Sequence, residues 1–237
     1  MLNFILLQAG QSLTGGALAA GKVVIPHRVE TGFIDMAIKG GPIMIPIVLL
    51  SFIAVYIFFD RYMAIRKAGK VDIRLMDRVR EYILDGKVDS AFALCRSENT
   101  PTSRMIEKGI LRIGRPMADV TTAIENVGNL EVSKLEKGLP VLASVAGGAP
   151  MLGFLGTVTG MIEAFYDMAN AGNNINITLL SSGIYQAMVT TVAGLIVGIA
   201  AYFAYNILVA NVESVVFKME AATINFMDML NESTRDK

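Results

Sequence analysis

Two uncharged stretches decide the fold: LPVLASVAGGAPMLGFLGTVTGMI, residues 139–162, and ITLLSSGIYQAMVTTVAGLIVGIAAYFAYNILV, residues 177–209. A third, IMIPIVLLSFIAVYIFF, covers residues 43–59. A helix needs about 20 apolar residues to cross a bilayer, and none of these stretches contains Asp, Glu, Lys, Arg or His. The sequence therefore predicts an all-α polytopic membrane protein with three transmembrane helices. The stretch at 177–209 is longer than a membrane requires, so its helix should tilt or project into water.

The amino-acid composition also indicates a protein that is partly surrounded by lipid. Hydrophobic residues make up 53% of the 237 residues and charged residues 18%, whereas soluble domains carry about 25% charged residues. The net charge of zero gives no reason to expect nucleic acid as a partner. No nucleotide-binding loop, metal-ligand cluster or nucleophilic triad is present, so we expect no enzyme activity and no cofactor. The single cysteine, Cys95, excludes an internal disulfide and should be a buried helix residue.

The distribution of positive charge predicts the orientation. The segment after the first span opens with a dense basic cluster, whereas residues 163–176, between the second and third spans, contain no Lys or Arg. Loops on the cytoplasmic side carry the excess of Lys and Arg. We therefore expect the N-terminus outside, residues 60–138 inside and the C-terminus inside. The cluster comprises Arg61, Arg66, Lys67, Lys70, Arg74, Arg78 and Arg80.

This pattern divides the chain into five segments. They are an external N-terminal arm with a short interfacial helix (1–39), the first transmembrane helix (40–62), a cytoplasmic helical region (63–138), the second and third transmembrane helices (139–210), and a cytoplasmic C-terminal helix and tail (211–237). We expect the arm to be retained, because it lacks the positive n-region of a signal peptide.

The cytoplasmic region should contain several amphipathic helices, because apolar residues recur in it at helical spacing. Asp85-Gly86 and Gly114 end two of them. Pro116 opens a long helix, and with no turn signal between Glu131 and Leu139 this helix is expected to continue directly into the second span. The expected ranges of the shorter helices are 72–84, 88–96 and 100–113.

The second and third spans each have a face of small residues. Such faces let membrane helices approach closely, and a lone Thr on one of them usually bonds its own i−4 carbonyl. Two small faces with Thr near their middles also suggest a narrow seam or pore that another helix could enter. At 100° per residue, the faces comprise Ala146, Ala149, Gly153, Gly156, Thr157, Gly160 and Ala164, and Gly183, Ala187, Thr190, Thr191, Gly194, Gly198 and Ala201.

The spans have no charged group, although ion transport typically uses an ionisable group inside the membrane. Either the protein does not transport ions, or a partner supplies the titratable group. Gln186 is polar, but its amide does not titrate.

Three stretches resemble a known family. APMLGFLGTVTGMIEAF (149–165) and IYQAMVTTVAGLIVGI (184–199) are similar to the two signature spans of the ExbB/TolQ/MotA proton-channel family. GGPIMIPIVLLSFIAVYIFFDRY (40–62) resembles the first span of the ExbB/TolQ branch. The three-span layout with a large first cytoplasmic loop also resembles that branch rather than four-span MotA.

The resemblance implies the ion-channel (stator) subunit of a proton-motive-force-driven motor in the bacterial inner membrane. It implies a homopentamer around a dimer of single-span ExbD/TolR-type partners, whose transmembrane Asp carries the protons. The output implied by the resemblance is an outer-membrane process, either TonB-linked uptake (ExbB-like, with a TonB-type protein) or envelope maintenance (TolQ-like). A non-conducting membrane scaffold is the alternative from another class, and the ion is either the proton or sodium.

The family's two pore threonines fall on Thr157 and Thr191, and Pro150 matches the proline before the GxxGT run. The chain departs from the family at Gln186, where many members have Glu, and at Ala200, where Pro is common. We also expect the small faces to pack subunit against subunit. Further positions expected to line the pore or pack the helices are Ala149, Gly153, Gly156, Gly160, Gly183, Gln186, Ala187, Thr190, Gly194 and Gly198.

Overall fold

The computed structural model describes residues 40–70, 74–170 and 177–235, which are helical apart from short turns and contain no strand. The expected N-terminal arm and the interfacial helix at 31–39 lie outside these residues. Three helical stretches are long and apolar enough to cross a membrane: Met44–Ala68, Met117–Asn170 and Leu180–Glu232. The predicted fold class is confirmed. In order, the helices are α3 (Met44–Ala68), α4 (Leu75–Leu84), α5 (Val88–Glu98), α6 (Pro101–Ile110), α7 (Met117–Glu136), α8 (Leu139–Asn170) and α9 (Ile177–Arg235).

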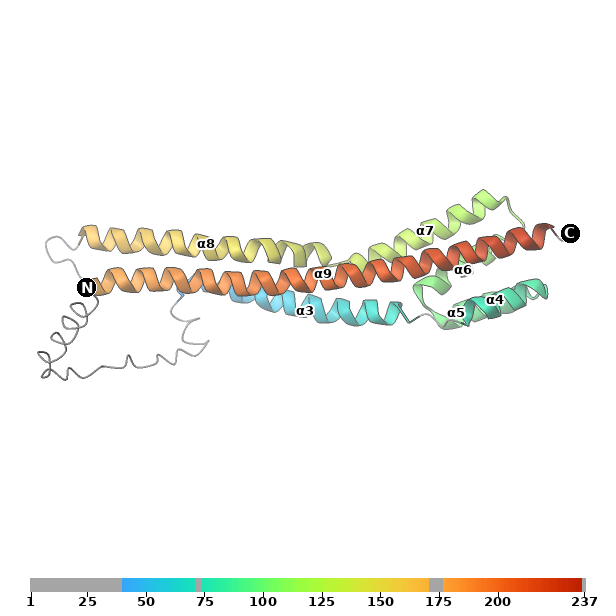
Figure 1. Ribbon diagram of the computed structural model, residues 1–237, viewed down its shortest axis with the longest axis horizontal. Coiled ribbons are helices and arrows are strands. Elements are labelled where there is room, and N and C mark those ends of the chain that lie inside the picture. Colours follow the sequence, from blue (N-terminus) through green and yellow to red (C-terminus); the bar gives the residue numbers. More distant parts are fainter. Residues whose placement is uncertain (1–39, 71–73, 171–176, 236–237) are drawn as a thin grey trace, which may run out of the picture. The chain divides into compact units, whose positions relative to one another are not determined.

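The longest helix, α9, organises the described part of the chain. It lies antiparallel to α8 over one half of its length, and α3 lies beside it in the same direction (Figure 1). Its 59 residues extend about 90 Å at 1.5 Å per residue, about three times the thickness of a bilayer core. The third span therefore continues far beyond the membrane, as its length predicted, and its far half packs against α4, α6 and α7.

The four shorter helices share an apolar core with the far half of α9. Phe226 of α9 is completely buried there with Ile106, Ile124 and Val79. Gly109 permits this packing, because a Cβ atom at that position would lie 2.7 Å from the Phe226 ring and 2.8 Å from Ile124 Cδ1. These contacts hold α6 and α7 against α9.

An ion-pair cluster joins α6 to α7. The Glu131 carboxylate is almost completely buried, and it accepts hydrogen bonds from Arg104 of α6 and, at 2.6 Å, from Lys134 one turn further along α7. Arg104 also donates to the carbonyl and side-chain oxygens of Asn99, at 3.1 Å and 2.6 Å. A buried carboxylate requires such partners, so the cluster fixes the start of α6 against α7.

The connection between α7 and α8 differs from the prediction. The expected continuous helix is interrupted at Lys137, whose ψ is 124°, and at Gly138, whose φ is +90°. Gly138 is a turn signal between Glu131 and Leu139, since glycine adopts a positive φ without steric cost. Arg61 of α3 donates to the Lys134 carbonyl at 3.2 Å, and so supplies a partner for one of the carbonyls left free at the end of α7.

Cys95 is a buried residue of α5, as predicted. Burial raises the pKa of its thiol to about 12, and the negative charges of Glu107 and Glu98 act in the same direction. Because the thiolate is the reactive species, the thiol of the folded protein should be nearly inert.

We expect Cys95 of the folded protein to react with a maleimide at pH 8 about a thousandfold more slowly than an exposed cysteine, whose pKa is about 8.5. Mass measurement after timed quenching follows the reaction. The same chain unfolded in denaturant should react at the rate of an exposed thiol. Fast labelling of the folded protein would show that α5 opens away from its neighbours.

Candidate functional site

The small faces of α8 and α9 meet each other within one chain. A Cβ atom on Gly153 would lie 3.0 Å from the Thr190 carbonyl oxygen, and one on Gly194 would lie 2.5 Å from the Ala149 carbonyl oxygen. Gly198 lies against the ring of Pro150, and Gly183 lies against the methyl group of Ala164. The two backbones are therefore in direct contact, as closely spaced small residues allow.

This arrangement corrects the expectation that the two small faces pack subunit against subunit. Their partner is the neighbouring helix of the same chain. Six residues, 171–176, separate α8 from α9 in the sequence, and a connection of that length commonly joins antiparallel neighbouring helices. These faces are therefore not available to a second copy of the chain.

Thr157 and Thr191 meet across this seam, and their hydroxyl groups are hydrogen-bonded to each other. Thr191 Oγ1 also donates to the Gly153 carbonyl at 3.0 Å, and Thr157 Oγ1 lies 3.3 Å from the Ala187 carbonyl. Gly153 and Ala187 are the i−4 residues of the two threonines, and weaker contacts of 3.3 Å and 3.4 Å reach those carbonyls within each helix. The structure thus joins two hydroxyls and two carbonyls in one polar cluster.

The cluster has spare capacity to accept hydrogen bonds. Each hydroxyl has one proton to donate and two lone pairs that accept. If Thr157 donates to Thr191, and Thr191 to Gly153, both protons are used while lone pairs on Thr157 stay free. Both side chains are partly exposed. A donor on another helix could therefore bond here without breaking the existing contacts.

The seam has two edges, and α3 covers one of them. Thr190 lies on that edge, 1% exposed, and donates to the Ala187 carbonyl at 2.8 Å. Its methyl group would lie 3.4 Å from a Cβ atom on Gly40, just before α3. The amide of Gln186 packs against Gly41, where a side chain would overlap it. Gln186 therefore lies apart from the Thr157–Thr191 pair, whereas Thr190 shares the Ala187 carbonyl with it.

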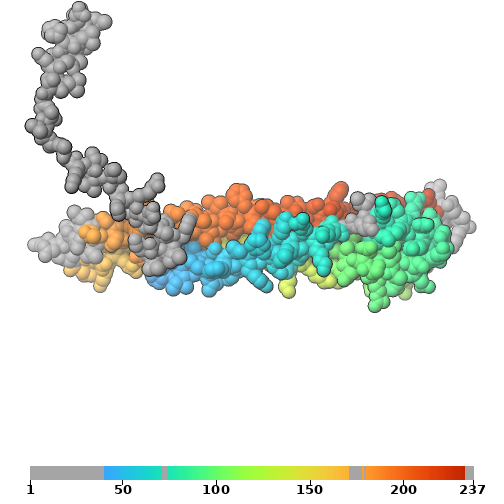
Figure 2. Space-filling view, turned by 90° about the horizontal axis from the view of Figure 1, so that it is seen from below, coloured from blue at the N-terminus to red at the C-terminus, as the bar shows by residue number. Residues whose placement is uncertain are grey.

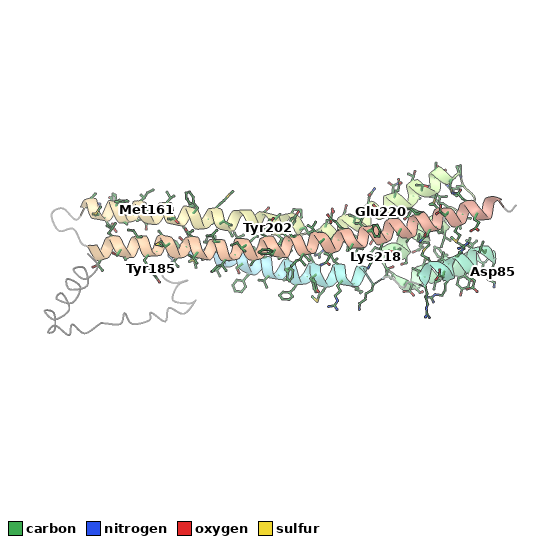
Figure 3. All side chains as sticks on the ribbon, in the orientation of Figure 1. Asp85, Met161, Tyr185, Tyr202, Lys218 and Glu220 are labelled. Carbon is green, nitrogen blue, oxygen red and sulfur yellow. The ribbon has the colours of Figure 1, made fainter. Side chains whose placement is uncertain are left out.

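The edge with the Thr157–Thr191 pair is open. The side chains beside the pair are large, apolar and exposed: Phe154 is 66% exposed and Met188 62%, and Met161, Ile184 and Leu195 are also exposed. Figure 3 shows such apolar side chains along both helices, with Met161 labelled on α8 and Tyr185 on α9. Lipid or another apolar helix must cover this face in a membrane.

Both threonines could be identified from the sequence, but the carbonyl groups of Gly153 and Ala187 could not be identified as shared acceptors. The i−4 spacing was a signal for the bond within each helix. That each carbonyl also serves the opposite threonine depends on how the two helices are paired, which spacing along one helix does not encode. The distance between the helices is set by the glycines.

The architecture and this seam agree with one family. Residues 97–221, just over half of the chain, match the MotA/TolQ/ExbB proton channel family. The chain belongs to this family, which is defined by proton channels and not by an enzyme reaction. The matched range contains α8, the Thr157–Thr191 pair and more than half of α9.

Relatives on both the ExbB and the TolQ side match the chain. An ExbB-like protein of Synechocystis sp. is 30% identical over 186 residues, which cover 75% of this chain and 70% of the relative. The Tol-Pal system protein TolQ of Haemophilus influenzae is 31% identical over 52% of this chain and 50% of the relative. The biopolymer transport protein ExbB of Aquifex aeolicus is 36% identical over 46% of this chain and 74% of the relative.

Proposed function

We propose that the chain is the ion-channel subunit of a proton-motive-force-driven motor in the bacterial inner membrane. In this proposal it is ExbB-like and energises an outer-membrane transport process through a single-span ExbD-type partner. The observation that supports it is the Thr157–Thr191 pair, two bonded hydroxyls on an open apolar face of spans without any charged residue. The ExbB and ExbB-like relatives favour this output.

The partner's transmembrane Asp supplies the titratable group that these spans lack. When protonated, its carboxyl group donates a hydrogen bond to a free lone pair on Thr157. When ionised, it accepts bonds from a threonine hydroxyl that turns away from its carbonyl. Hydroxyl donors and water favour the anion, whereas dry apolar surroundings favour the neutral acid. The partner helix can move its Asp from the threonine pair to the apolar side chains of Phe154 or Met188. This movement therefore changes the affinity of the Asp carboxylate for the proton.

We propose five copies of the chain around a dimer of the partner. The open face of α8 and α9 faces the partner, and other exposed apolar surface of the spans contacts neighbouring copies. This assignment leaves the glycine faces inside each subunit. The mass of the intact complex should then equal five copies of this chain and two of the partner.

Two other functions have some support. The match to TolQ favours an envelope-maintenance motor with the same channel chemistry and a TolR-type partner. A non-conducting scaffold is favoured by the threonine hydroxyls themselves, because both of their protons already have acceptors within the seam. The scaffold requires no flux, so flux measurements separate it from both motors.

The test is ion uptake by vesicles that contain the chain and a co-expressed single-span protein of the ExbD type. Acid-driven proton uptake should require both proteins, and Asp→Asn in the partner's span should abolish it. The same assay under a sodium gradient distinguishes sodium from the proton. A complex that assembles without flux of either ion would contradict the channel and favour the scaffold.

The proposed orientation puts residues 60–138 and the C-terminus in the cytoplasm. A cysteine introduced at Asn173 should react with a membrane-impermeant maleimide in intact spheroplasts, whereas Arg96→Cys and Ser233→Cys should react only after the membrane is opened. Cys95 gives little background, because its thiol is buried. Labelling of Arg96→Cys in intact spheroplasts would reverse the orientation.

A further inference from the structure

Two adjacent hollows lie between α3 and α9. The first is an apolar groove of about 310 Å³ within the spans. Small residues leave this space open, namely Ser51 and Ala54 on α3 and Ala200, Ala201 and Ala204 on α9. Figure 2 shows α3, in blue and cyan, lying along α9, in orange and red, at the surface of the protein.

The second hollow is a basic pocket of about 420 Å³. Three cations line it: Arg66, Lys70 and Lys218. Asn211 and Ser214 of α9 add polar groups, and no acidic residue is part of the lining. Lys218 donates to the Gly69 carbonyl at 3.2 Å and lies beside the C-terminal end of α3 (Figure 3). Within the described part of the chain, Arg66 and Lys70 have no ion pair with an acidic residue.

The two hollows follow one another along the same pair of helices. Phe58 and Ile207 line the groove, and Tyr62 and Asn211, each four residues further on, line the basic pocket. Four residues are about 6 Å along a helix, so the pocket continues the groove. Because α3 and α9 run in the same direction (Figure 1), long side chains on both helices lean back toward the groove.

The position along the spans places the pocket at the edge of the membrane. The uncharged run of α3 ends at Asp60, and that of α9 ends at Glu213. Neither acidic residue lines the basic pocket. Asp60 accepts a hydrogen bond from Arg61, and Glu213 lines a separate hollow with Pro140. The three cations therefore face a boundary where lipid phosphates lie, and their charge is not offset within the pocket.

We propose that the α3–α9 crevice binds one anionic phospholipid, with an acyl chain in the apolar groove and the headgroup phosphate in the basic pocket. Arg66, Lys70 and Lys218 donate charge-assisted hydrogen bonds to the phosphate oxygens. Asn211 and Ser214 donate neutral hydrogen bonds to the phosphate or the glycerol. Basic pockets between membrane helices are suited to such headgroups. The bound lipid would fasten α3 to α9 on the side away from the threonine pair.

The probe is phosphatidylglycerol, compared with phosphatidylcholine of the same acyl chains. Delipidated full-length protein in neutral detergent is titrated with each lipid, and bound lipid is counted by native mass spectrometry. Phosphatidylglycerol should bind more tightly. Changing Arg66, Lys70 and Lys218 together to Gln should weaken its binding about a hundredfold, since each basic residue near an anionic lipid contributes about fivefold. Phosphatidylcholine has the same phosphate but a choline cation that offsets its charge, so its binding should weaken less.

Lys67→Gln is the matched control, because Lys67 is exposed on α3 but does not line the pocket. Ala204→Leu should fill the groove and weaken the binding of both lipids, whereas Ala210→Leu, outside the lining, should not. Equal phosphatidylglycerol binding by the triple Gln variant would overturn the proposal. The proposal would also be overturned if glycerol 3-phosphate, which has no acyl chain, competed as well as phosphatidylglycerol. A second copy of the chain in the crevice in place of lipid would overturn it too.

Discussion

Replacing Thr157 or Thr191 by valine should lower partner-dependent proton uptake about a hundredfold while the chain stays folded and bound to its partner. Valine nearly matches threonine in shape, so the close packing of α8 and α9 is kept. The hydroxyl that bonds across the seam is lost. A preorganised hydrogen-bond donor at a site of changing charge contributes about a hundredfold or more to a rate.

Because the two hydroxyls bond to each other and to the same two carbonyls, they should act as one unit. The double variant should therefore be no worse than either single variant, as is usual for coupled residues. Thr157→Ser and Thr191→Ser should retain most of the uptake, since serine keeps the hydroxyl. Uptake is measured in vesicles with the partner present, and assembly is measured on the same samples.

Thr159→Val is the matched control for this prediction. Thr159 is on α8 but bonds within its own helix, at 3.0 Å to the Leu155 carbonyl. Its replacement should leave uptake unchanged. Gln186→Ala should also be milder than the valine variants, because Gln186 lies against Gly41 on the edge that α3 covers. If the Thr→Val variants kept full activity and Gln186→Ala had no activity, the ion path would have to lie along the edge that α3 covers.

Much of this architecture could be predicted because the relevant signals are local. Uncharged runs indicated the spans, and Asp85-Gly86 marked the end of α4, with a positive φ at Gly86. The helix expected to end at Gly114 ends earlier, because α6 stops at Ile110 and Gly114 lies in the turn that follows. The 100° spacing placed Thr157 and Thr191 on the small faces of their helices. Each of these inferences uses residues within one or two turns of one another.

The sequence does not indicate which helix or residue packs against each surface. A face of glycines shows that a backbone can approach, but the same face would suit another copy or the same chain. The Arg61 contact that caps α7 joins residues 73 positions apart. The shared use of the Gly153 carbonyl likewise depends on the relative rotation of α8 and α9. Gly138 is different, because its signal was local and was missed.

Because the small faces of α8 and α9 pack against each other within one chain, a bulky substitution on them should affect folding of the subunit and not only its assembly. Gly194→Leu should prevent α8 and α9 from pairing, so that the subunit itself fails to fold. A Cβ atom on Gly194 would lie 2.5 Å from the Ala149 carbonyl oxygen and 2.9 Å from Gly153 Cα. These are backbone atoms of a helix, which do not move aside as a flexible side chain does. Even Gly194→Ala must therefore force the helices apart.

We expect Gly194→Ala to lower the free energy of unfolding by about 1–3 kcal/mol, as overpacking usually does. Gly194→Leu should lower it by more than the total stability of a typical protein, which is about 5–15 kcal/mol. Heat stability in detergent and a disulfide cross-link between cysteines introduced on α8 and α9 measure the two effects. Gly147→Ala and Gly148→Ala are matched controls on α8, because a Cβ atom at either position would meet nothing within 4 Å.

The two accounts of the glycine faces make opposite predictions for one sample. If the faces pack within the chain, Gly194→Leu lowers the yield of folded protein, abolishes the α8–α9 cross-link and separates Thr157 from Thr191. If they pack between chains, the variant gives a stable, cross-linkable subunit that runs as a monomer. A folded Gly194→Leu monomer would therefore contradict the intramolecular seam, and with it the paired hydroxyls on which the proposed ion path depends.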